Sequence, residues 1–460
     1  MENNIKISII IPVYNTAEYL RRCLDSCVFQ TMREIEIITI CDCSSDIRDK
    51  QIIQEYERNY ANMVRGVFHK QNLGAGEARN SGIRAAKGEF LMFCDSDDFL
   101  ELNACKTMYD TVCFNDADLV ICDYFYLRDG IIGTRTVNAC IESVSHNQRP
   151  FYLDKSTVWT VMLKKTLIED NELFFSPCRF GEDSITALWY LAAKKITKVN
   201  IPLYYYVYRK SSLIGSMTEQ ASVDLADAYI YLLNYKYFAA LENEIKRTVC
   251  YSIFRRFFGY WLERLYKEPQ GNFQELFKRL IDIKNYCNDF YASANNVKFN
   301  WETRRIFAML RFAESNLQTG NFNERFRNFY SVLDMRITAY AVQKLCENLK
   351  GKRIVLWVAG SYGRIHKECL KNIGIKFEMT DINAASLGYK CWDELKDITD
   401  IVLVSSNEFV KTVIKIVTSQ NKTDGNMDNL PIEVLDLQTY LNENCNITPT
   451  LFLDCSIVKN

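Results

Sequence analysis

A short apolar run that ends in a cluster of acidic residues constrains this chain most. In Phe90 to Leu100, FLMFCDSDDFL, five apolar or small residues precede Asp95, Asp97 and Asp98. The run predicts a buried strand, and ligands bind at the carboxyl ends of strands in open α/β sheets. Because the carboxylates repel one another, a divalent metal that bridges to a phosphorylated ligand would stabilise them. The competing interpretation is an acidic turn in which Asp97 or Asp98 caps the next helix.

The residues around this run alternate between apolar strands and helical spacing. The predicted strands cover residues 7–13, 35–41, 64–68, 90–94, 118–124 and 199–208, and the predicted helices cover residues 17–30, 50–60, 74–87, 159–168 and 184–194. The βαβαβ order at the start indicates a parallel sheet with helices on both faces. Pro202 suggests that the last strand lies at an edge. Residues 125–150 are predicted to be irregular or a hairpin.

Two further places carry residues that suit a phosphorylated ligand. Gly74 and Gly76 open a helix and allow the backbone to approach a ligand closely. Arg79 follows about one turn later, within reach of a phosphate or a base edge, although a surface arginine is the simpler interpretation. Asp183 lies at the start of a helix, where an acidic residue often serves only as a cap.

Composition limits the classes of protein to consider. The 460 residues suggest two to three domains, and a net charge of -1 gives no argument for a nucleic-acid partner. The amino-terminal apolar run is too short for a signal peptide and lacks a cleavage site. No apolar stretch approaches the roughly 18 residues that a membrane span requires.

The cysteines indicate a reducing compartment. There are 17 of them, an odd number without a Cys-x-x-Cys pair, and several, such as Cys94 and Cys122, lie in apolar runs as small hydrophobic residues. Cys41 and Cys43 have no second pair and no nearby histidine, so no zinc site is predicted. The three histidines are His69, His146 and His366. We therefore expect a cytoplasmic protein.

The rest of the chain predicts two more domains, a helical one at residues 221–349 and a small Rossmann-like one at 350–460. Residues 251–267 are aromatic and basic, which suits either peripheral contact with the inner face of a membrane or a helical core with snorkelling side chains. In the last domain Val358 replaces the first glycine of a dinucleotide fingerprint, which weighs against such a site. Asp381 nevertheless falls where a ribose-binding acid would.

Taken in order, the motifs of residues 1–220 resemble those of the inverting family 2 nucleotide-sugar glycosyltransferases, which have a GT-A fold. The matching segments are IIPVYN at the start, Asp42 to Asp46, Gly74 to Asn80, the DxD-type motif Asp95 to Asp98, Gly181 to Asp183, and Tyr204 to Arg209. The resemblance implies a hexosyl transfer from a nucleotide-diphospho-sugar, expected to be a UDP-sugar. The acceptor would be a saccharide or a lipid-linked saccharide in polysaccharide biosynthesis.

The resemblance also implies a role for individual residues. Asp183 would be the catalytic base, Asp97 would coordinate Mn2+ or Mg2+, and Asp95 would contact the ribose. The base and diphosphate side would include Pro12, Tyr14, Asp42 and Arg79, and the acceptor or diphosphate side would include Trp159, Glu182 and Arg209. The chemistry agrees, because a metal stabilises the leaving diphosphate and a carboxylate must take the acceptor's proton.

The chain departs from the family pattern in the nucleotide-binding turn. Cys41 and Cys43 replace an aspartate and a glycine there, and a residue other than glycine at 43 restricts φ. We expect base recognition through Asp42 to survive with an altered turn and weaker donor affinity.

Two alternatives stay open. A sugar-nucleotide nucleotidyltransferase would need a glycine-rich basic loop after the first strand, where Pro12 to Asn15 stands instead. A non-catalytic scaffold with a degenerate donor site would fit the two cysteines but not the intact Asp95, Asp97 and Asp183. The sequence names neither the sugar nor the acceptor.

Overall fold

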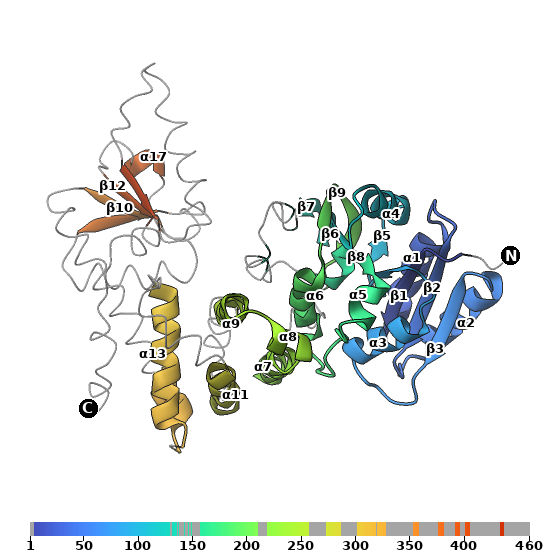
Figure 1. Ribbon diagram of the computed structural model, residues 1–460. Helices are drawn as coiled ribbons and strands as arrows, with labels where there is room; N and C mark the ends of the chain where they lie inside the picture. The colour runs from blue at the N-terminus through green and yellow to red at the C-terminus, as the bar shows by residue number, and fades with distance from the viewer. Residues whose placement is uncertain are drawn as a thin grey trace. The chain divides into compact units, whose positions relative to one another are not determined.

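The computed structural model describes residues 4–128, 131–135, 157–209, 219–256, 273–286 and most of 301–327, a few single residues between 137 and 149, and short segments after 352. The chain divides into two compact units, residues 1–297 and 298–460 (Figure 1). The predicted boundaries at residues 220 and 349 stay predictions.

Four parallel strands form the amino-terminal half of the main sheet, as predicted. They are β1 (Ile7–Val13), β2 (Ile35–Cys41), β3 (Val64–Phe68) and β4 (Phe90–Phe93), in the order β3-β2-β1-β4. β1 and β4 are almost completely buried, because each is a run of apolar side chains with strands on both sides. The carboxyl ends of β1, β2 and β4 therefore meet at one edge of the sheet.

Helices cover both faces of these strands. The helices of this part are α1 (Ala17–Val28), α2 (Ile47–Asn59), α3 (Ala75–Ala85) and α4 (Ala104–Phe114). Alternate residues of β1, such as Ile9 and Ile11, pack in one cluster with Leu20 of α1. On the other face α3 lies so close that a Cβ at Gly82 would stand 2.4 Å from Ile10. This contact fixes the helix that carries Arg79 against the sheet.

The second half of the sheet is mixed, which the βαβαβ pattern of the first half did not predict. β8 (Val161–Lys164) runs antiparallel to β4 and to β6 (Leu119–Arg128), and β6 forms a hairpin with β7 (Ile131–Arg135). The predicted helix at 159–168 was also wrong. A 3-10 turn, η3 (Val158–Thr160), precedes β8, and only α5 (Lys165–Glu169) is helical. Tertiary pairing between two buried strands outweighs the local pattern.

The last strand of this sheet is not at the edge. β9 (Ile196–Val207) lies between β6 and the short β5 (Phe99–Leu100), in contrast to the expectation from Pro202. Pro202 stands opposite Asp123 at a shift of register between β6 and β9. A proline without an N–H is tolerated at such an irregularity. Before β9 the chain forms η4 (Glu182–Ile185) and α6 (Thr186–Ala192).

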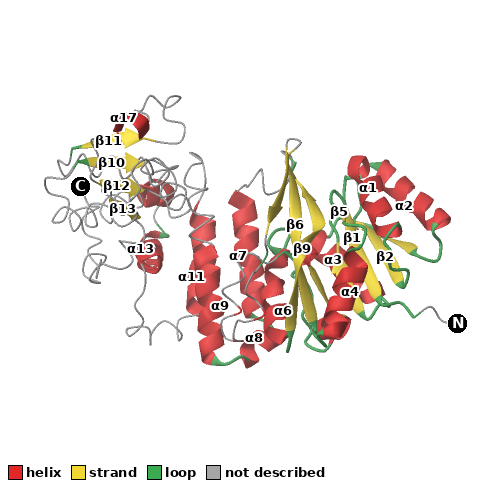
Figure 2. Ribbon diagram, turned by 90° about the horizontal axis from the view of Figure 1, so that it is seen from above, coloured by secondary structure: helices red, strands yellow, loops and turns green. Residues whose placement is uncertain are grey.

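Helices complete the first unit. They are α7 (Glu219–Leu233), α8 (Lys236–Ala240), α9 (Asn243–Arg256) and α11 (Phe273–Tyr286), and α7 packs beside α11 (Figure 2). Membrane contact was one of two expectations for residues 251–267. Ser252 and Ile253, in the described start of this segment, are buried, which favours a position in the core there. Residues 257–267 lie outside the described residues. No helix within the described ranges has the length and apolarity to span a membrane.

The second unit contains α13 (Trp301–Asn316), the short α17 (Trp392–Leu395) and a small sheet. Its strands are β10 (Ile354–Trp357), β11 (Phe377–Thr380), β12 (Ile401–Val404) and β13 (Glu433–Asp436), all parallel in the order β11-β10-β12-β13. This agrees with the predicted Rossmann-like layer. The glycine loop after β10 and Asp381 lie outside the described residues.

The described cysteines of the main sheet and its helices are free thiols. Cys250 in α9 is disulfide-bonded, which the sequence did not suggest.

Candidate active site

The turns that follow β1 and β2 are tied together by Asn15. Its side-chain oxygen accepts hydrogen bonds from Ser45 Oγ and from the Asp46 N–H, both at 3.1 Å, and its own N–H donates to Ser44 Oγ. Asn15 has a φ of 54°, a left-handed conformation that asparagine tolerates. Asn15 is thus a positioning residue that no sequence motif singled out. Beside it the Tyr14 side chain is 49% exposed, so its ring is open to a flat ligand.

Asp42 is buried and organises the glycine-rich loop. Its carboxylate accepts hydrogen bonds from the N–H groups of Leu73 at 2.9 Å and Gly74 at 2.8 Å, and it lies 2.7 Å from His69 Nδ1. His69 Nε2 contacts Ser81 Oγ at 3.0 Å. Both carboxylate oxygens are thus engaged within the protein. The predicted contact of Asp42 with a base stays a prediction, and His69 is a positioning residue that sequence reasoning missed.

The turn after β2 keeps a left-handed residue despite the loss of glycine. Cys43 is exposed and has a φ of 56°. A side chain in this region costs roughly 1–2 kcal/mol relative to glycine. The cysteine therefore adopts the conformation that a glycine would take, under strain.

Arg79 joins the acidic loop after β4 to the acidic pair before α6. Its guanidinium is almost completely buried, with Nη2 at 2.7 Å from Asp95 Oδ1 and Nη1 at 2.7 Å from Glu182 Oε1. The ring of Phe175 lies 5.5 Å from its Cζ. Burial by itself lowers the pKa of Arg79, but the two carboxylates outweigh it and raise that pKa. The structure therefore brings together three residues that the sequence had placed on different sides of the site.

Glu182 and Asp183 begin η4, directly after Gly181. Gly181 has a φ of 80° and is the N-cap, so Asp183 is not the capping residue that the competing interpretation required. Burial and the neighbouring charge of Asp183 raise the pKa of Glu182, and Arg79 opposes this shift. Glu182 and Asp183 are both partly exposed.

The three aspartates after β4 have different environments. Asp98 is buried and accepts hydrogen bonds from the Val207 N–H at 2.7 Å and from Tyr204 Oη at 2.8 Å. Burial and the charges of Asp97 and Asp95 raise its pKa well above the usual range. Asp98 therefore fixes the loop to β9.

Asp97 forms an ion pair with Arg209, which follows β9. Burial and the charge of Asp95 raise the pKa of Asp97, and Arg209 opposes the shift. The guanidinium carbon of Arg209 also lies 5.0 Å from the ring centroid of Tyr19 in α1. The carboxylate oxygens of Asp95 and Asp97 are the hard ligands that Mg2+ or Mn2+ prefers, so the residues fit such an ion. An ion at Asp97 would compete with Arg209 for that carboxylate.

An aromatic wall, formed by Trp159, Tyr124, Tyr204 and Tyr206, stands beside the acidic loop. Trp159 stacks on Tyr204 with ring centroids 4.4 Å apart and on Tyr206 at 5.6 Å, and Tyr124 meets it edge-on at 4.8 Å. Burial, followed by the charges of Asp98, Asp97 and Asp95, raises the pKa of Tyr206 to about 12. The wall is therefore close to the acidic loop, and Trp159 and Tyr206 are only partly buried.

Comparison with known proteins identifies the family. Residues 8–159 match the model of "Glycosyl transferase family 2". The glycosyltransferase GlyG of Streptococcus pneumoniae serotype 4 is 34% identical over 45% of this chain and 72% of its own length. The chain belongs to glycosyl transferase family 2. The glycosyltransferase GlyA of the same organism is 30% identical, and the match spans 33% of its length. EpsH of Bacillus subtilis, named a putative glycosyltransferase, is 33% identical, and the match spans 62% of its length.

Solved structures agree on the fold. The crystal structure of residues 1–349 of Staphylococcus aureus TarS in complex with UDP-GlcNAc aligns with a TM-score of 0.56, at 21% identity, over 71% of this chain and 91% of that one. The GT-A fold expected from the family 2 motifs is thus confirmed.

Replacing Cys43 by glycine should stabilise the protein. Glycine removes the left-handed strain but also increases the entropy of the unfolded chain, and the second effect offsets part of the first. The free energy of unfolding should therefore rise by about 0.5–1 kcal/mol. Urea denaturation followed by fluorescence measures this. The control is Cys43→Ala, which removes the thiol but keeps the Cβ and should leave the stability unchanged. A destabilised Cys43→Gly would show that the turn needs the side chain.

Replacing Arg79 by glutamine should destabilise the protein by about 2 kcal/mol at pH 8, because two partly buried carboxylates lose their cation. Without Arg79 the pKa of Glu182, which burial already raises, should rise further. A carboxyl group with a raised folded-state pKa contributes stability at low pH that is lost as the pH rises through that pKa. The deficit of Arg79→Gln should therefore be smaller at pH 5 than at pH 8 in urea denaturation.

Arg84→Gln on the exposed side of the same helix is the control and should change the stability by less than about 0.5 kcal/mol. Equal deficits of Arg79→Gln at both pH values would contradict a charge-based role.

Proposed function

We propose that this chain is an inverting glycosyltransferase that moves a sugar from a UDP-sugar to a hydroxyl group of a saccharide or lipid-linked saccharide. The observation that carries the proposal is the buried Arg79, which holds Asp95 of the acidic loop 2.7 Å from one nitrogen and Glu182, next to Asp183, 2.7 Å from another. Donor-side and acceptor-side carboxylates are thereby kept near each other. A single displacement needs this arrangement, with the base and the leaving group on either side of one carbon.

The relatives support the general reaction. GlyG is named a glycosyltransferase, and TarS of Staphylococcus aureus, 27% identical over 56% of this chain, is named a poly(ribitol-phosphate) beta-N-acetylglucosaminyltransferase. These names favour surface polysaccharide or teichoic acid assembly as the process and UDP-GlcNAc as the first donor to test. The proposed location is the cytoplasmic side, where nucleotide sugars are available.

The proposed roles on the donor side follow from exposure and charge. Tyr14 and Pro12 offer an open surface to the base, and Asp42 holds the glycine loop that borders it. Asp95 contacts the ribose, and one of its oxygens is already fixed by Arg79. Asp97 and Asp95 would hold Mn2+ or Mg2+, which would supply positive charge to the leaving diphosphate.

The proposed transfer uses Asp183 as the base. The acceptor oxygen attacks the anomeric carbon as the bond from that carbon to the diphosphate breaks, and the hydroxyl proton passes to the Asp183 carboxylate. Attack opposite the leaving group inverts the anomeric centre. Arg79 keeps Glu182 in place beside the base. The partly exposed Trp159 and Tyr206 offer an apolar face on which an acceptor sugar can stack.

Arg209 has two proposed partners. In the described structure it pairs with Asp97. When donor and metal bind, the same guanidinium is free to turn to the diphosphate, where it would stabilise the developing negative charge. Arg209 thus serves as the counterion of Asp97 before the donor arrives.

An assay of a nucleotide-sugar panel with Mn2+ distinguishes this proposal from its alternatives. A glycosyltransferase releases nucleoside diphosphate from a sugar nucleotide, whereas a nucleotidyltransferase forms pyrophosphate from a nucleoside triphosphate and a sugar phosphate. A scaffold would bind the donor and release neither product. Release of UDP from one member of the panel, increased by an acceptor, is the expected result.

Asp97→Ala should lower the release of UDP at least about 100-fold, because the charge that develops on the leaving group loses its support. The rate of UDP release measures this, and circular dichroism checks the fold. The control is Asp110→Ala, which removes an exposed carboxylate on α4 and should leave the rate unchanged. Turnover of Asp97→Ala at the wild-type rate would show that the metal role is wrong.

Asp183→Asn should bind the donor with an affinity close to that of wild type but transfer sugar about 100- to 10,000-fold more slowly, because only the proton acceptor is lost. Calorimetry measures the binding and a radiolabelled donor measures the transfer. Asp170→Asn, at an exposed position after α5, is the control. Loss of donor binding in Asp183→Asn would indicate a structural role instead.

A further inference from the structure

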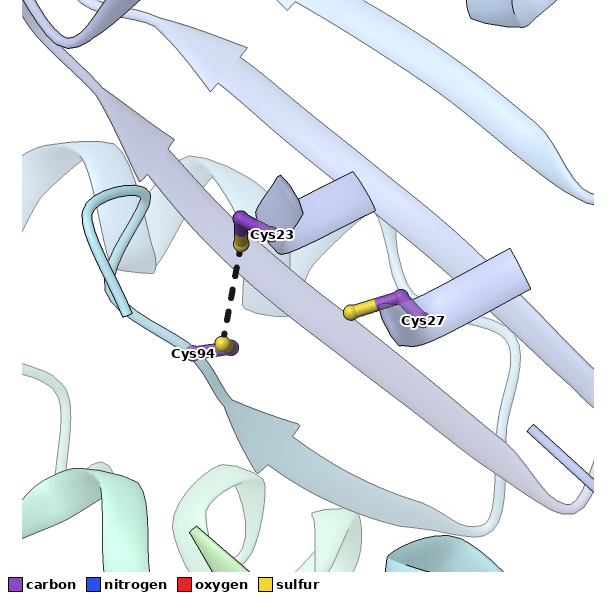
Figure 3. Close-up of side chains that lie close together, drawn as sticks. All are labelled: Cys23, Cys27 and Cys94. Carbon is purple, nitrogen blue, oxygen red and sulfur yellow. Dashed lines mark hydrogen bonds between the residues drawn. The ribbon is translucent and has the colours of Figure 1, made fainter. Parts of the chain in front are cut away.

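Three buried cysteines bring their sulfur atoms together beneath the acidic loop. Cys23 and Cys27 lie one turn apart on α1, and Cys94 follows β4 directly, 71 residues after Cys23. None of the three side chains has any exposed surface. The three sulfur atoms lie within 4.8 Å of one another, with Cys23 Sγ 3.7 Å from Cys94 Sγ (Figure 3).

The spacing of these donor atoms resembles that of a thiolate metal site. With Zn–S bonds of about 2.3 Å and tetrahedral angles, the sulfur atoms of a zinc site lie about 3.8 Å apart. The carbonyl oxygen of Asp95 borders the same point, 3.6 Å from Cys23 Sγ and 3.7 Å from Cys94 Sγ. The cysteines thus supply three soft donors, and the carbonyl stands near a fourth position.

The thiols already interact with one another. The Cys23 and Cys94 sulfur atoms, 3.7 Å apart, share a hydrogen bond. A bound cation would take the place of the protons that the thiols share. Apolar side chains such as Leu20, Leu24 and Met92 belong to the same core cluster and limit the access of water.

We propose that Cys23, Cys27 and Cys94 form a structural site for a thiophilic d10 cation, with Zn2+ as its occupant. Soft thiolate ligands select such ions over the Mg2+ or Mn2+ of the donor site. Each thiol that becomes a ligand releases its proton to the solvent as the metal–sulfur bond forms. The bound ion would join α1 to the residue that precedes Asp95, and so fix the start of the acidic loop. This inference is independent of the proposed transfer reaction.

The test uses the full chain, reduced and stripped of metal with a chelator. Zn2+ is titrated in competition with a chromophoric chelator, and Cd2+ serves as a probe through its ultraviolet thiolate-to-metal charge-transfer band. We expect one tight ion per wild-type chain, with release of protons and a higher unfolding temperature in Zn2+. Cys27→Ala and Cys94→Ala should each weaken the binding at least 100-fold and lose the thermal shift.

Cys105→Ala is the matched control, because Cys105 is equally buried and lies next to Met92 but is not one of the three. It should bind Zn2+ as wild type does. Equal affinity in wild type and Cys27→Ala, or a wild-type chain without a Cd2+ band, would show that the three cysteines only pack in the core. If the alanine variants do not fold, the number of protons that wild type releases per bound Zn2+ tests the proposal instead. A value below two would overturn the site, because each thiol that becomes a ligand releases its proton.

Discussion

The candidate site depends on one buried cation, Arg79. Its guanidinium is held between Asp95 and Glu182, at 2.7 Å from each. A buried charge is costly unless it is paired, and the two partly buried carboxylates would lose their cation without Arg79. The position of each partner therefore depends on the other two. Because Arg79 lies in α3, and Gly82 packs that helix directly against β1, the sheet itself sets the distance between the two acidic segments.

Burial divides the acidic residues of the site into two groups. Asp42 and Asp98 are buried, and their oxygens accept hydrogen bonds from backbone N–H groups, so they shape the loops. Asp95, Asp97 and Asp183 are partly exposed, and direct chemical roles are proposed for these three. The same residue type thus serves as a scaffold or as a reactive group according to the number of its internal partners.

Thiol and carboxylate groups lie next to each other at the carboxyl end of β4. Cys94 turns inward to the two thiols of α1, whereas Asp95 and Asp97 form ion pairs with Arg79 and Arg209. A hard-cation site and a soft-cation site would then stand within a few residues of each other. Their ligands keep them distinct, because oxygen atoms favour Mg2+ or Mn2+ and sulfur atoms favour Zn2+.

The sequence by itself determined the amino-terminal strands, the acidic loop and the ordered motifs that indicate the family, because these are local patterns. It did not determine β8, since a short apolar run such as Val161 to Leu163 suits a helix or a strand equally. The pairing of Arg79 with Glu182, the contact of His69 with Asp42 and the cluster around Cys94 also needed the tertiary structure. Each joins residues far apart in the chain, and only the pairing of the strands brings them within a hydrogen bond of one another.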